Sequence, residues 1–207
     1  MAIHDVYQAV IGFDKNGMAA LVRDELEAGT AITAILNEGL IAALDEVGER
    51  FSRGDLFIPE MLQAAQTAQE GLDVLKPLLT EATTRSAGTV VIGTVQGDLH
   101  DIGKSLVKMM LKGAGFQVID LGVDVSVGHF LEAVAENRAD ILALSALLTT
   151  TMPAMRDTVK RFRENGTSVK VMVGGAPVTE EFAEEIGADG YAGDASQAVS
   201  LARRLMA

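Results

Sequence analysis

The residues with the clearest chemical potential are Asp98 and His100, which lie just beyond a run of apolar residues. The run, residues 88–95, predicts a strand that is buried on both faces of a sheet, and helical periodicity begins near residue 102. The carboxyl ends of such strands form the edge where open α/β sheets bind ligands. A histidine there can bind a metal through one ring nitrogen while the other donates to a carboxylate. The spacing therefore predicts a metal-binding imidazole with an acidic partner.

Two later loops carry features that fit the same edge. Ser145, Leu147 and Thr149 follow a third predicted strand, and the pair Gly174-Gly175 follows a fourth. Because parallel strands end at one edge, we expect these loops to meet the first one although they are distant in sequence. Adjacent glycines let a flat or extended ligand approach the backbone, since no Cβ stands in the way. Three loops thus predict one binding site.

Each of these features also has a purely structural explanation. Paired glycines after a strand can serve only to turn the chain, and Ser145 can be a strand-end hydroxyl with a local partner. Asp98 or Asp101 is a suitable N-cap for the helix that follows. The conjunction of all three features, in this order and at one edge, favours a binding site over these alternatives.

The second half of the chain alternates between strands and helices. Apolar strands are predicted at 88–95, 116–120, 139–145, 168–173 and 189–192, and helices at 102–114, 126–137, 152–164, 178–187 and from 195. Such alternation is typical of parallel sheets with right-handed helical crossovers. The prediction is a doubly wound, five-stranded parallel α/β domain of the Rossmann or flavodoxin-like type over residues 87–207.

The first half, residues 1–86, shows only the periodicity of helices. Four helices are predicted at about 3–13 and 15–28 and over the apolar stripes 32–51 and 61–75. Together they predict an all-α four-helix bundle. The polar segment 80–87 lacks periodicity and is the predicted linker between the two domains.

Composition argues against several classes of protein. The chain has 207 residues, a net charge of −12 and no cysteine. Nucleic-acid surfaces need clustered Lys and Arg, and disulfides, thiolate metal sites and cysteine nucleophiles need cysteine. No apolar run approaches the roughly 18 residues that span a bilayer, and the N-terminus lacks a basic segment followed by an apolar one. We expect a cytoplasmic protein without nucleic-acid or membrane partners.

Taken together, these residues resemble the signature of the cobalamin-binding proteins of the methionine synthase and corrinoid methyltransferase type. That signature is Asp-x-His-x-x-Gly, then Ser-x-Leu, then Gly-Gly. The matching residues are Asp98, His100 and Gly103, then Ser145 and Leu147, then Gly174 and Gly175. The helical half resembles the family's cap domain through residues 47–51 and 57–61. The resemblance covers nearly the whole chain. It is strongest for the free-standing corrinoid proteins of methanogens and acetogens.

The resemblance implies a role for each site residue. His100 would coordinate cobalt after displacing the cofactor's own base, an arrangement called base-off/His-on, and Asp98 would accept the remaining imidazole proton. Thr151 stands where methionine synthase has a serine that extends this pair. The implied cofactor contacts are Gly97, Asp98, Leu99, His100, Asp101, Ile102, Gly103, Ser145, Leu147, Thr149, Gly174 and Gly175.

A moving cap is also implied. In this family the helical domain covers the upper face of the corrin and swings away during turnover. Phe57 and Met61 are candidates to shield the cobalt, with core packing as the alternative explanation for both. Segment 80–87 would then be the hinge.

The implied function is that of a component of a multi-subunit methyltransferase. It would carry a methyl group on cobalt, cycling between methylcobalamin and Co(I), from a substrate-specific methyltransferase to a second, methyl-accepting one. The donor would be a methylamine, methanol, a betaine or a methoxylated aromatic in an O-demethylase system, and a reductive activase is a further expected partner. The alternatives are the cobalamin-binding subunit of an adenosylcobalamin mutase and a cobalamin-dependent sensor. Flavin or nucleotide binding would need a Gly-rich phosphate loop after the first strand, which the sequence lacks.

Overall fold

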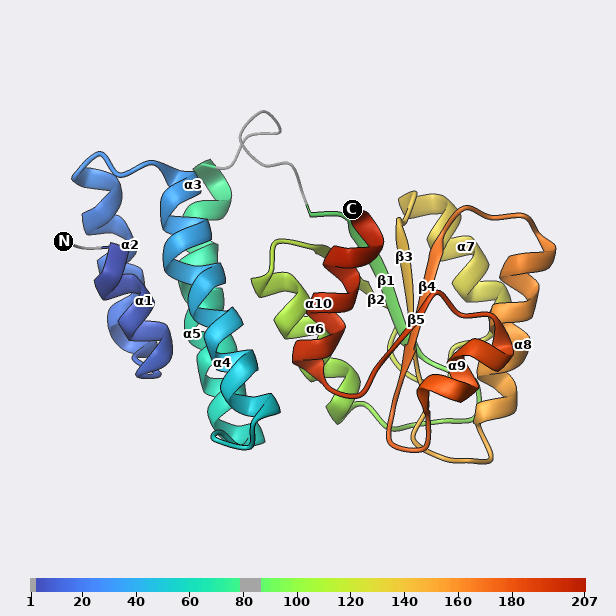
Figure 1. Cartoon of the computed structure of the whole chain (residues 1–207). Helices are drawn as coiled ribbons and strands as arrows, with labels where there is room; N and C mark the ends of the chain where they lie inside the picture. The colour runs from blue at the N-terminus through green and yellow to red at the C-terminus, as the bar shows by residue number, and fades with distance from the viewer. Residues whose placement is uncertain (1–2, 79–86) are drawn as a thin grey trace. The chain divides into compact units, whose positions relative to one another are not determined.

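The chain folds into two compact units. The computed structural model describes residues 3–78 and 87–207. One unit is built from the N-terminal helices, and the other comprises Ala87–Leu111 and Phe116–Ala207 (Figure 1). Nearly all of the predicted linker at 80–87 lies outside the described residues, so the hinge stays a prediction. Within the described part of the chain, no helix is long and apolar enough to cross a membrane.

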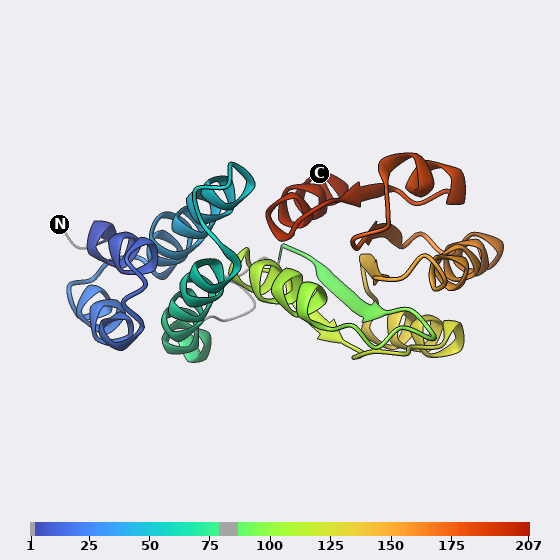
Figure 2. The same cartoon turned by 90° about the horizontal axis from the view of Figure 1, so that it is seen from below.

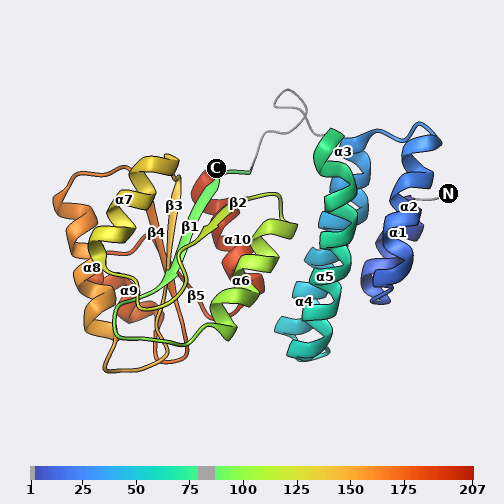
Figure 3. The ribbon, with the colours of Figure 1, turned by 180° about the vertical axis from the view of Figure 1, so that it is seen from behind.

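The helical unit consists of four helical rods, as the periodicity predicts. Figure 3 shows this unit from behind. Its elements are α1 (Ile3–Ile11), α2 (Lys15–Glu27), α3 (Ile32–Ala34), η1 (Ile35–Ile41), α4 (Ala42–Ser52), α5 (Ile58–Leu75) and η2 (Lys76–Leu78). The elements α3, η1 and α4 follow one another without a break and form one rod. Helix α1 packs against η1 and α4, and α2 packs against α5. The Asp14 carboxylate caps α2 by accepting a hydrogen bond from the Gly17 N–H.

The middle of the long rod, η1, is a π-helix, in which the Ala42 N–H donates to the Asn37 carbonyl. The buried residues Leu36, Leu40 and Leu44 are spaced by four. An α-helix would rotate each of them by about 40° relative to the last, because its turn holds 3.6 residues. Hydrogen bonds that reach five residues back widen the turn. The π segment therefore keeps this predicted apolar stripe on the core.

The two candidate shielding residues of α5 have different environments. Met61 is fully buried, so core packing accounts for it without a shielding role. Phe57, directly before α5, is 71% exposed. Core packing does not account for Phe57, and its shielding role stays a prediction.

The α/β unit is a doubly wound parallel sheet, as predicted. Its strands are β1 (Thr89–Thr94), β2 (Gln117–Asp120), β3 (Ile141–Ser145), β4 (Lys170–Gly174) and β5 (Gly190–Ala192), in the order β2-β1-β3-β4-β5. The helices are α6 (Ile102–Gly113), α7 (Val127–Asn137), α8 (Met152–Glu164), α9 (Glu180–Ile186) and α10 (Ala195–Met206). Helices α6 and α10 cover one face, and α7, α8 and α9 cover the other (Figure 2). Every predicted element is present, with ends shifted by up to two residues.

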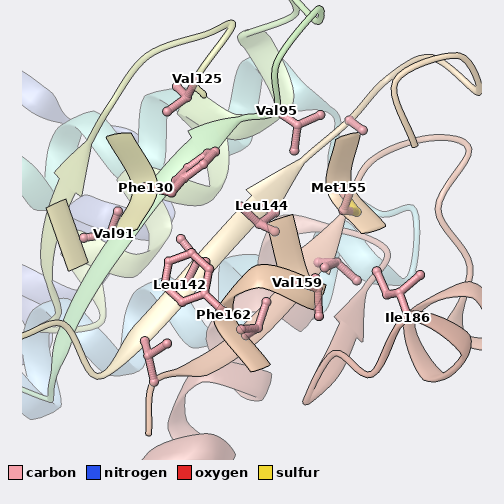
Figure 4. Packing of buried hydrophobic residues seen from close by; sticks show 14 of the residues in the cluster. Val91, Val95, Val125, Phe130, Leu142, Leu144, Met155, Val159, Phe162 and Ile186 are labelled. Carbon is pink, nitrogen blue, oxygen red and sulfur yellow. The ribbon is translucent and has the colours of Figure 1, made fainter. Parts of the chain in front are cut away.

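A continuous apolar core joins the sheet to helices α7, α8 and α9. Phe130 of α7 and Phe162 and Met155 of α8 are fully buried against the strands (Figure 4). Strand β1 is buried along nearly its whole length, as expected of a strand covered by helices on both faces. Close packing of this kind fixes the strand ends and gives the loops beyond them a rigid base.

The point where the chain reverses direction across the sheet lies between β1 and β3. From β1 the chain passes to β2 on one side, and it then returns to β3 on the other. Thr94, Ser145 and Gly174 are in register across β1, β3 and β4, so these strands end side by side. Open α/β sheets bind ligands outside the carboxyl ends of the strands at such a point.

Candidate functional site

A buried carboxylate organises this edge of the sheet. The side chain of Asp98, in the loop after β1, is fully buried, and its two oxygens accept five hydrogen bonds. Oδ1 lies 3.1 Å from the His100 N and 2.6 Å from the His100 Nδ1. Oδ2 lies 2.7 Å from the Leu147 N, 3.3 Å from the Leu148 N and 2.7 Å from the Thr151 Oγ1. One side chain thus joins the loops after β1 and β3.

These hydrogen bonds determine the charge of Asp98. Burial by itself would raise the pKa of the carboxyl group, because a charged group loses its hydration. The donors from Leu147, Thr151 and His100 outweigh burial and hold the pKa of Asp98 well below its usual range. Asp98 is therefore an ionised acceptor at neutral pH. Its bonds go to the loops and to His100 rather than to the first turn of α6, so its role as a helix N-cap is not supported.

The His100 ring is held on one side and open on the other. Its Nδ1 faces Asp98, and 48% of the side chain is exposed. The His100 carbonyl also accepts a hydrogen bond from the Thr94 hydroxyl at 2.9 Å, which ties the loop to the end of β1. With the proton on Nδ1 directed at an ionised carboxylate, Nε2 carries the lone pair that can bind a metal.

Thr151, the residue before α8, completes a chain of three side chains. Its hydroxyl is buried and lies between two acceptors, the Asp98 Oδ2 and the Leu148 carbonyl at 2.9 Å. A hydroxyl has one proton, and the ionised carboxylate is the stronger acceptor. The structure therefore brings His100, Asp98 and Thr151 into one hydrogen-bonded chain.

Large exposed apolar side chains occur in the His100 loop and in the loop after β3. Leu99 and Ile102 flank His100 and are 72% and 78% exposed, and Leu147 and Leu148 after β3 are also exposed. Exposed apolar residues concentrated on two adjacent loops mark a surface that a ligand or a partner covers. One metal-binding nitrogen within an apolar surface suits a metal whose other ligands belong to a flat macrocycle, because the protein then supplies a single axial ligand.

The structure places the remaining predicted residues on the same edge, with different surroundings. Gly97 is in the left-handed region at φ 85°, and Gly103 in α6 has open space around the position of a Cβ. Thr149 is exposed, and Ser145 is half-buried at the end of β3.

Gly174 and Gly175 are required by the protein itself. A Cβ on Gly175 would lie 1.9 Å from the Ala146 carbonyl oxygen, and one on Gly174 would lie 2.7 Å from that of Ala192. Close approach of backbones is therefore a structural reason for glycine at both positions, and their contact with a cofactor stays a prediction.

Sequence reasoning missed a buried ionic network beside the site. The buried Lys104 ammonium lies 2.7 Å from Asp101 and 2.5 Å from Asp120, and Lys108 lies 2.7 Å from the second oxygen of Asp120. Burial acts to raise the pKa of Asp120, but the two lysines and the Gly122 N–H lower it to about 2. Asp120 ends β2 at the same edge, so the strand-end argument used for the other loops could have found it.

Comparison with known proteins agrees with this geometry. A B12 binding domain model matches residues 88–200, and a second B12 binding domain model matches residues 2–76. The chain is 44% identical to dimethylamine corrinoid protein 1 of Methanosarcina acetivorans, over 99% of this chain and 97% of that protein.

Solved structures extend the comparison to the whole fold. A cobalamin-binding protein from Desulfitobacterium hafniense DCB-2 has a TM-score of 0.83 and 33% identity and covers 98% of both chains. The methanol:cobalamin methyltransferase complex of Methanosarcina barkeri contains a chain with a TM-score of 0.87 and 28% identity, covering 99% of this chain and 79% of that one. The sequence and the structure agree in both halves, and the chain therefore belongs to the B12-binding corrinoid proteins of methyltransferase systems.

Proposed function

We propose that this chain is a corrinoid protein that carries a methyl group on cobalt between a substrate-specific methyltransferase and a second, methyl-accepting methyltransferase. The observation that carries the proposal is the His100–Asp98–Thr151 chain, which leaves one imidazole nitrogen at an exposed, apolar edge of the sheet. A relative similar over its whole length is a dimethylamine corrinoid protein, and a structural neighbour belongs to a methanol:cobalamin methyltransferase complex.

In this proposal His100 would hold the cobalt of the cofactor through its imidazole, in the base-off/His-on arrangement. Asp98 holds the Nδ1 proton, which fixes the tautomer so that Nε2 presents its lone pair. The Asp98 carboxyl, whose pKa is held well below its usual range, is the acceptor in this hydrogen bond. When bound, the cobalt centre supplies the chemistry of accepting and releasing a methyl group.

Thr151 supports the pair from the far side of Asp98. Its hydroxyl donates to Oδ2, so Asp98 couples the charge of His100 to the strength of a buried hydrogen bond. The exposed residues Leu99, Ile102, Leu147 and Leu148 would be covered by the corrin ring. We propose that the remaining contacts to the cofactor come from Gly97, Asp101, Gly103, Ser145, Thr149, Gly174 and Gly175.

The donor that fits the relatives best is a methylamine, with methanol as the nearest alternative. The expected partners are the two methyltransferases and a reductive activase. Similarity over 99% of the chain to a dimethylamine corrinoid protein favours a methyl carrier over the mutase subunit or the sensor considered from sequence.

The test is reconstitution with cobalamin followed by electron paramagnetic resonance in the Co(II) state. An axial nitrogen splits the cobalt signal, and ¹⁵N-histidine labelling of the protein should turn the triplet into a doublet only if the nitrogen is histidine. His100→Ala should abolish this change, whereas His129→Ala, at an exposed position in α7, should leave it intact. A protein that binds no cobalamin, or that shows no isotope effect, would overturn the proposed ligand.

A second assay addresses the methyl donor. The reconstituted protein is mixed with a dimethylamine-specific or a methanol-specific methyltransferase and the matching donor, and methylation is followed by absorbance. We expect methylation with a methylamine enzyme and its loss in His100→Ala. Methylation with neither enzyme, together with full binding of adenosylcobalamin and mutase activity beside a partner subunit, would favour the alternative function.

A further inference from the structure

Asp124 adopts a backbone conformation that few residues tolerate. It lies in the loop between β2 and α7 with φ 54°, in the left-handed region, and it is not a glycine. Aspartate and asparagine enter this region more readily than other residues with a side chain, but the conformation still costs free energy. Strained residues of this kind persist where the surrounding structure needs them. The contacts of Asp124 show what it holds.

The carboxylate and the N–H of Asp124 both form hydrogen bonds to the loop that carries His100. The Asp124 carboxylate accepts a hydrogen bond from the Gly97 N–H at 2.7 Å. The Asp124 N–H donates to the Asp98 carbonyl at 2.9 Å. The left-handed conformation lets one residue direct its amide and its carboxylate at two successive residues of the partner loop.

The neighbouring residues join the same two loops. The Val125 N–H donates to the Thr94 carbonyl, and Val95 and Val125 form an isolated parallel bridge. The β2–α7 loop therefore extends the sheet past the end of β1, and Asp124 forms the last contact before the irregular turn to His100. Its carboxylate thus holds the turn at Gly97, which is itself left-handed at φ 85°.

We propose that Asp124 is a positioning residue for His100. It holds the backbone at Gly97 and Asp98, which orients the buried carboxylate and through it the imidazole. These hydrogen bonds of Asp124 go to the backbone on which the histidine pair is built. This inference rests on the proposed function, because the orientation matters only if His100 binds the cofactor.

The alternative is that Asp124 merely forms a turn, and three substitutions separate the two roles. Asp124→Gly removes the strain and also the acceptor. Asp124→Asn keeps an acceptor oxygen and tolerates the left-handed region. Asp124→Ala loses both advantages. The matched controls are Arg138→Gly and Arg138→Ala, since Arg138 ends α7 with a similar φ of 48° at the opposite edge of the sheet.

The experiment measures cobalamin affinity, the ¹⁵N-histidine isotope effect in the Co(II) spectrum and stability in urea for each variant. We expect Asp124→Gly to fold, to bind cobalamin about tenfold more weakly and to lose a large part of the His-on signal, as for the loss of one hydrogen bond. Asp124→Asn should behave like the wild type in both cofactor readouts. The Arg138 variants should change stability alone.

The inference is overturned if Asp124→Gly retains the full His-on signal and an affinity within about twofold of the wild type, or if Asp124→Asn fails as badly as Asp124→Gly. Should Asp124→Gly not fold, Asp124→Ala, which also lacks the acceptor, is judged by the same criteria. Failure of the wild type to show a histidine signal would instead overturn the proposed function.

Discussion

At the scale of single residues, the site depends on one fully buried carboxylate that makes contacts in two directions. Asp98 receives His100 on one oxygen and Thr151 with the loop after β3 on the other. Its low pKa follows from these donors and not from an adjacent cation. A group held in this way stabilises the two loops and the tautomer of the histidine at once, so stability and cofactor binding should be linked at this position.

Thr151→Val tests the buried end of this chain. Valine has nearly the same shape but no hydroxyl, so Asp98 Oδ2 would lose one donor, and we expect a loss of about 1–2 kcal/mol in the free energy of unfolding. The loss of the donor should also raise the pKa of Asp98 and reduce the His-on fraction of bound cobalamin. Urea unfolding and Co(II) spectra measure the two effects.

Thr151→Ser is the control, because it restores the hydroxyl. It should recover most of the His-on signal. An unchanged spectrum in Thr151→Val would mean that the threonine supports the fold alone.

At the scale of elements, helix α6 is attached to strand β2 by charges. Lys104 and Lys108, one helical turn apart on α6, both contact Asp120 at the end of β2. Because α6 begins directly after the histidine loop, this attachment also limits how far that loop can move. The pKa of Asp120, lowered to about 2, gives the contribution a defined dependence on pH.

The sign follows from comparing folded and unfolded states. In the unfolded chain Asp120 has an ordinary pKa near 3.9, so the depressed folded value contributes about 2 kcal/mol of stability above that pH. The contribution is lost as the pH falls from about 4 toward 2, and roughly half remains at pH 3. Asp120→Asn should therefore be less stable than the wild type at pH 7, with a difference that shrinks at pH 3.

Urea unfolding at the two pH values measures this difference. Glu132→Gln, which changes an exposed carboxylate of α7, is the control and should show no comparable pH-dependent gap. A gap of constant size for Asp120→Asn would show that lost packing, not charge, causes the destabilisation.

Two glycines at the edge separate folding from binding. Gly175→Ala would place a Cβ against the Ala146 carbonyl and forces a backbone shift, so we expect a loss of about 3 kcal/mol or more in stability. Gly103→Ala meets no atom and lies within α6, where alanine is favoured by about 0.5–1 kcal/mol. Gly103→Ala should therefore fold at least as well as the wild type and yet bind cobalamin more weakly.

Thermal unfolding and cobalamin titration of both variants measure these effects. Normal affinity in Gly103→Ala would remove Gly103 from the proposed cofactor contacts. Normal stability in Gly175→Ala would contradict the close backbone approach at the end of β4.

At the scale of the whole molecule, the chain combines a helical unit with an α/β unit, and the predicted cofactor residues all lie in the second. A ligand that binds only the folded state stabilises that state by mass action. Thermal unfolding with cobalamin at about 100 times its Kd should raise the stability by about 2.7 kcal/mol in the wild type.

The same measurement on His100→Ala should show a smaller shift at the same cobalamin concentration. An equal shift in both proteins would mean that affinity arises away from the imidazole. Calorimetry also shows whether one or two transitions move, which reports whether the helical unit shares in the stabilisation.

The sequence alone determined the order and type of nearly every element and the set of loops at the site. Alternating apolar strands and helices have one common solution, and parallel strands necessarily end together, so Asp98, His100 and Ser145 could be placed on one edge without coordinates. The periodicity of the first half likewise determined four helical rods. These properties are local and repeat along the chain, and a sequence displays them directly.

Only the tertiary structure decided which side chains meet and why. Asp124 and Lys104 could not be chosen from sequence, because their importance depends on a backbone torsion and on burial between elements. The close backbone contact at Gly175 could not be read from the sequence either, since the atom that a Cβ would meet belongs to Ala146, in the loop after another strand. Met61 was likewise settled as a core residue only by its burial. Contacts between distant segments depend on the packing of the whole domain, which no local sequence pattern predicts.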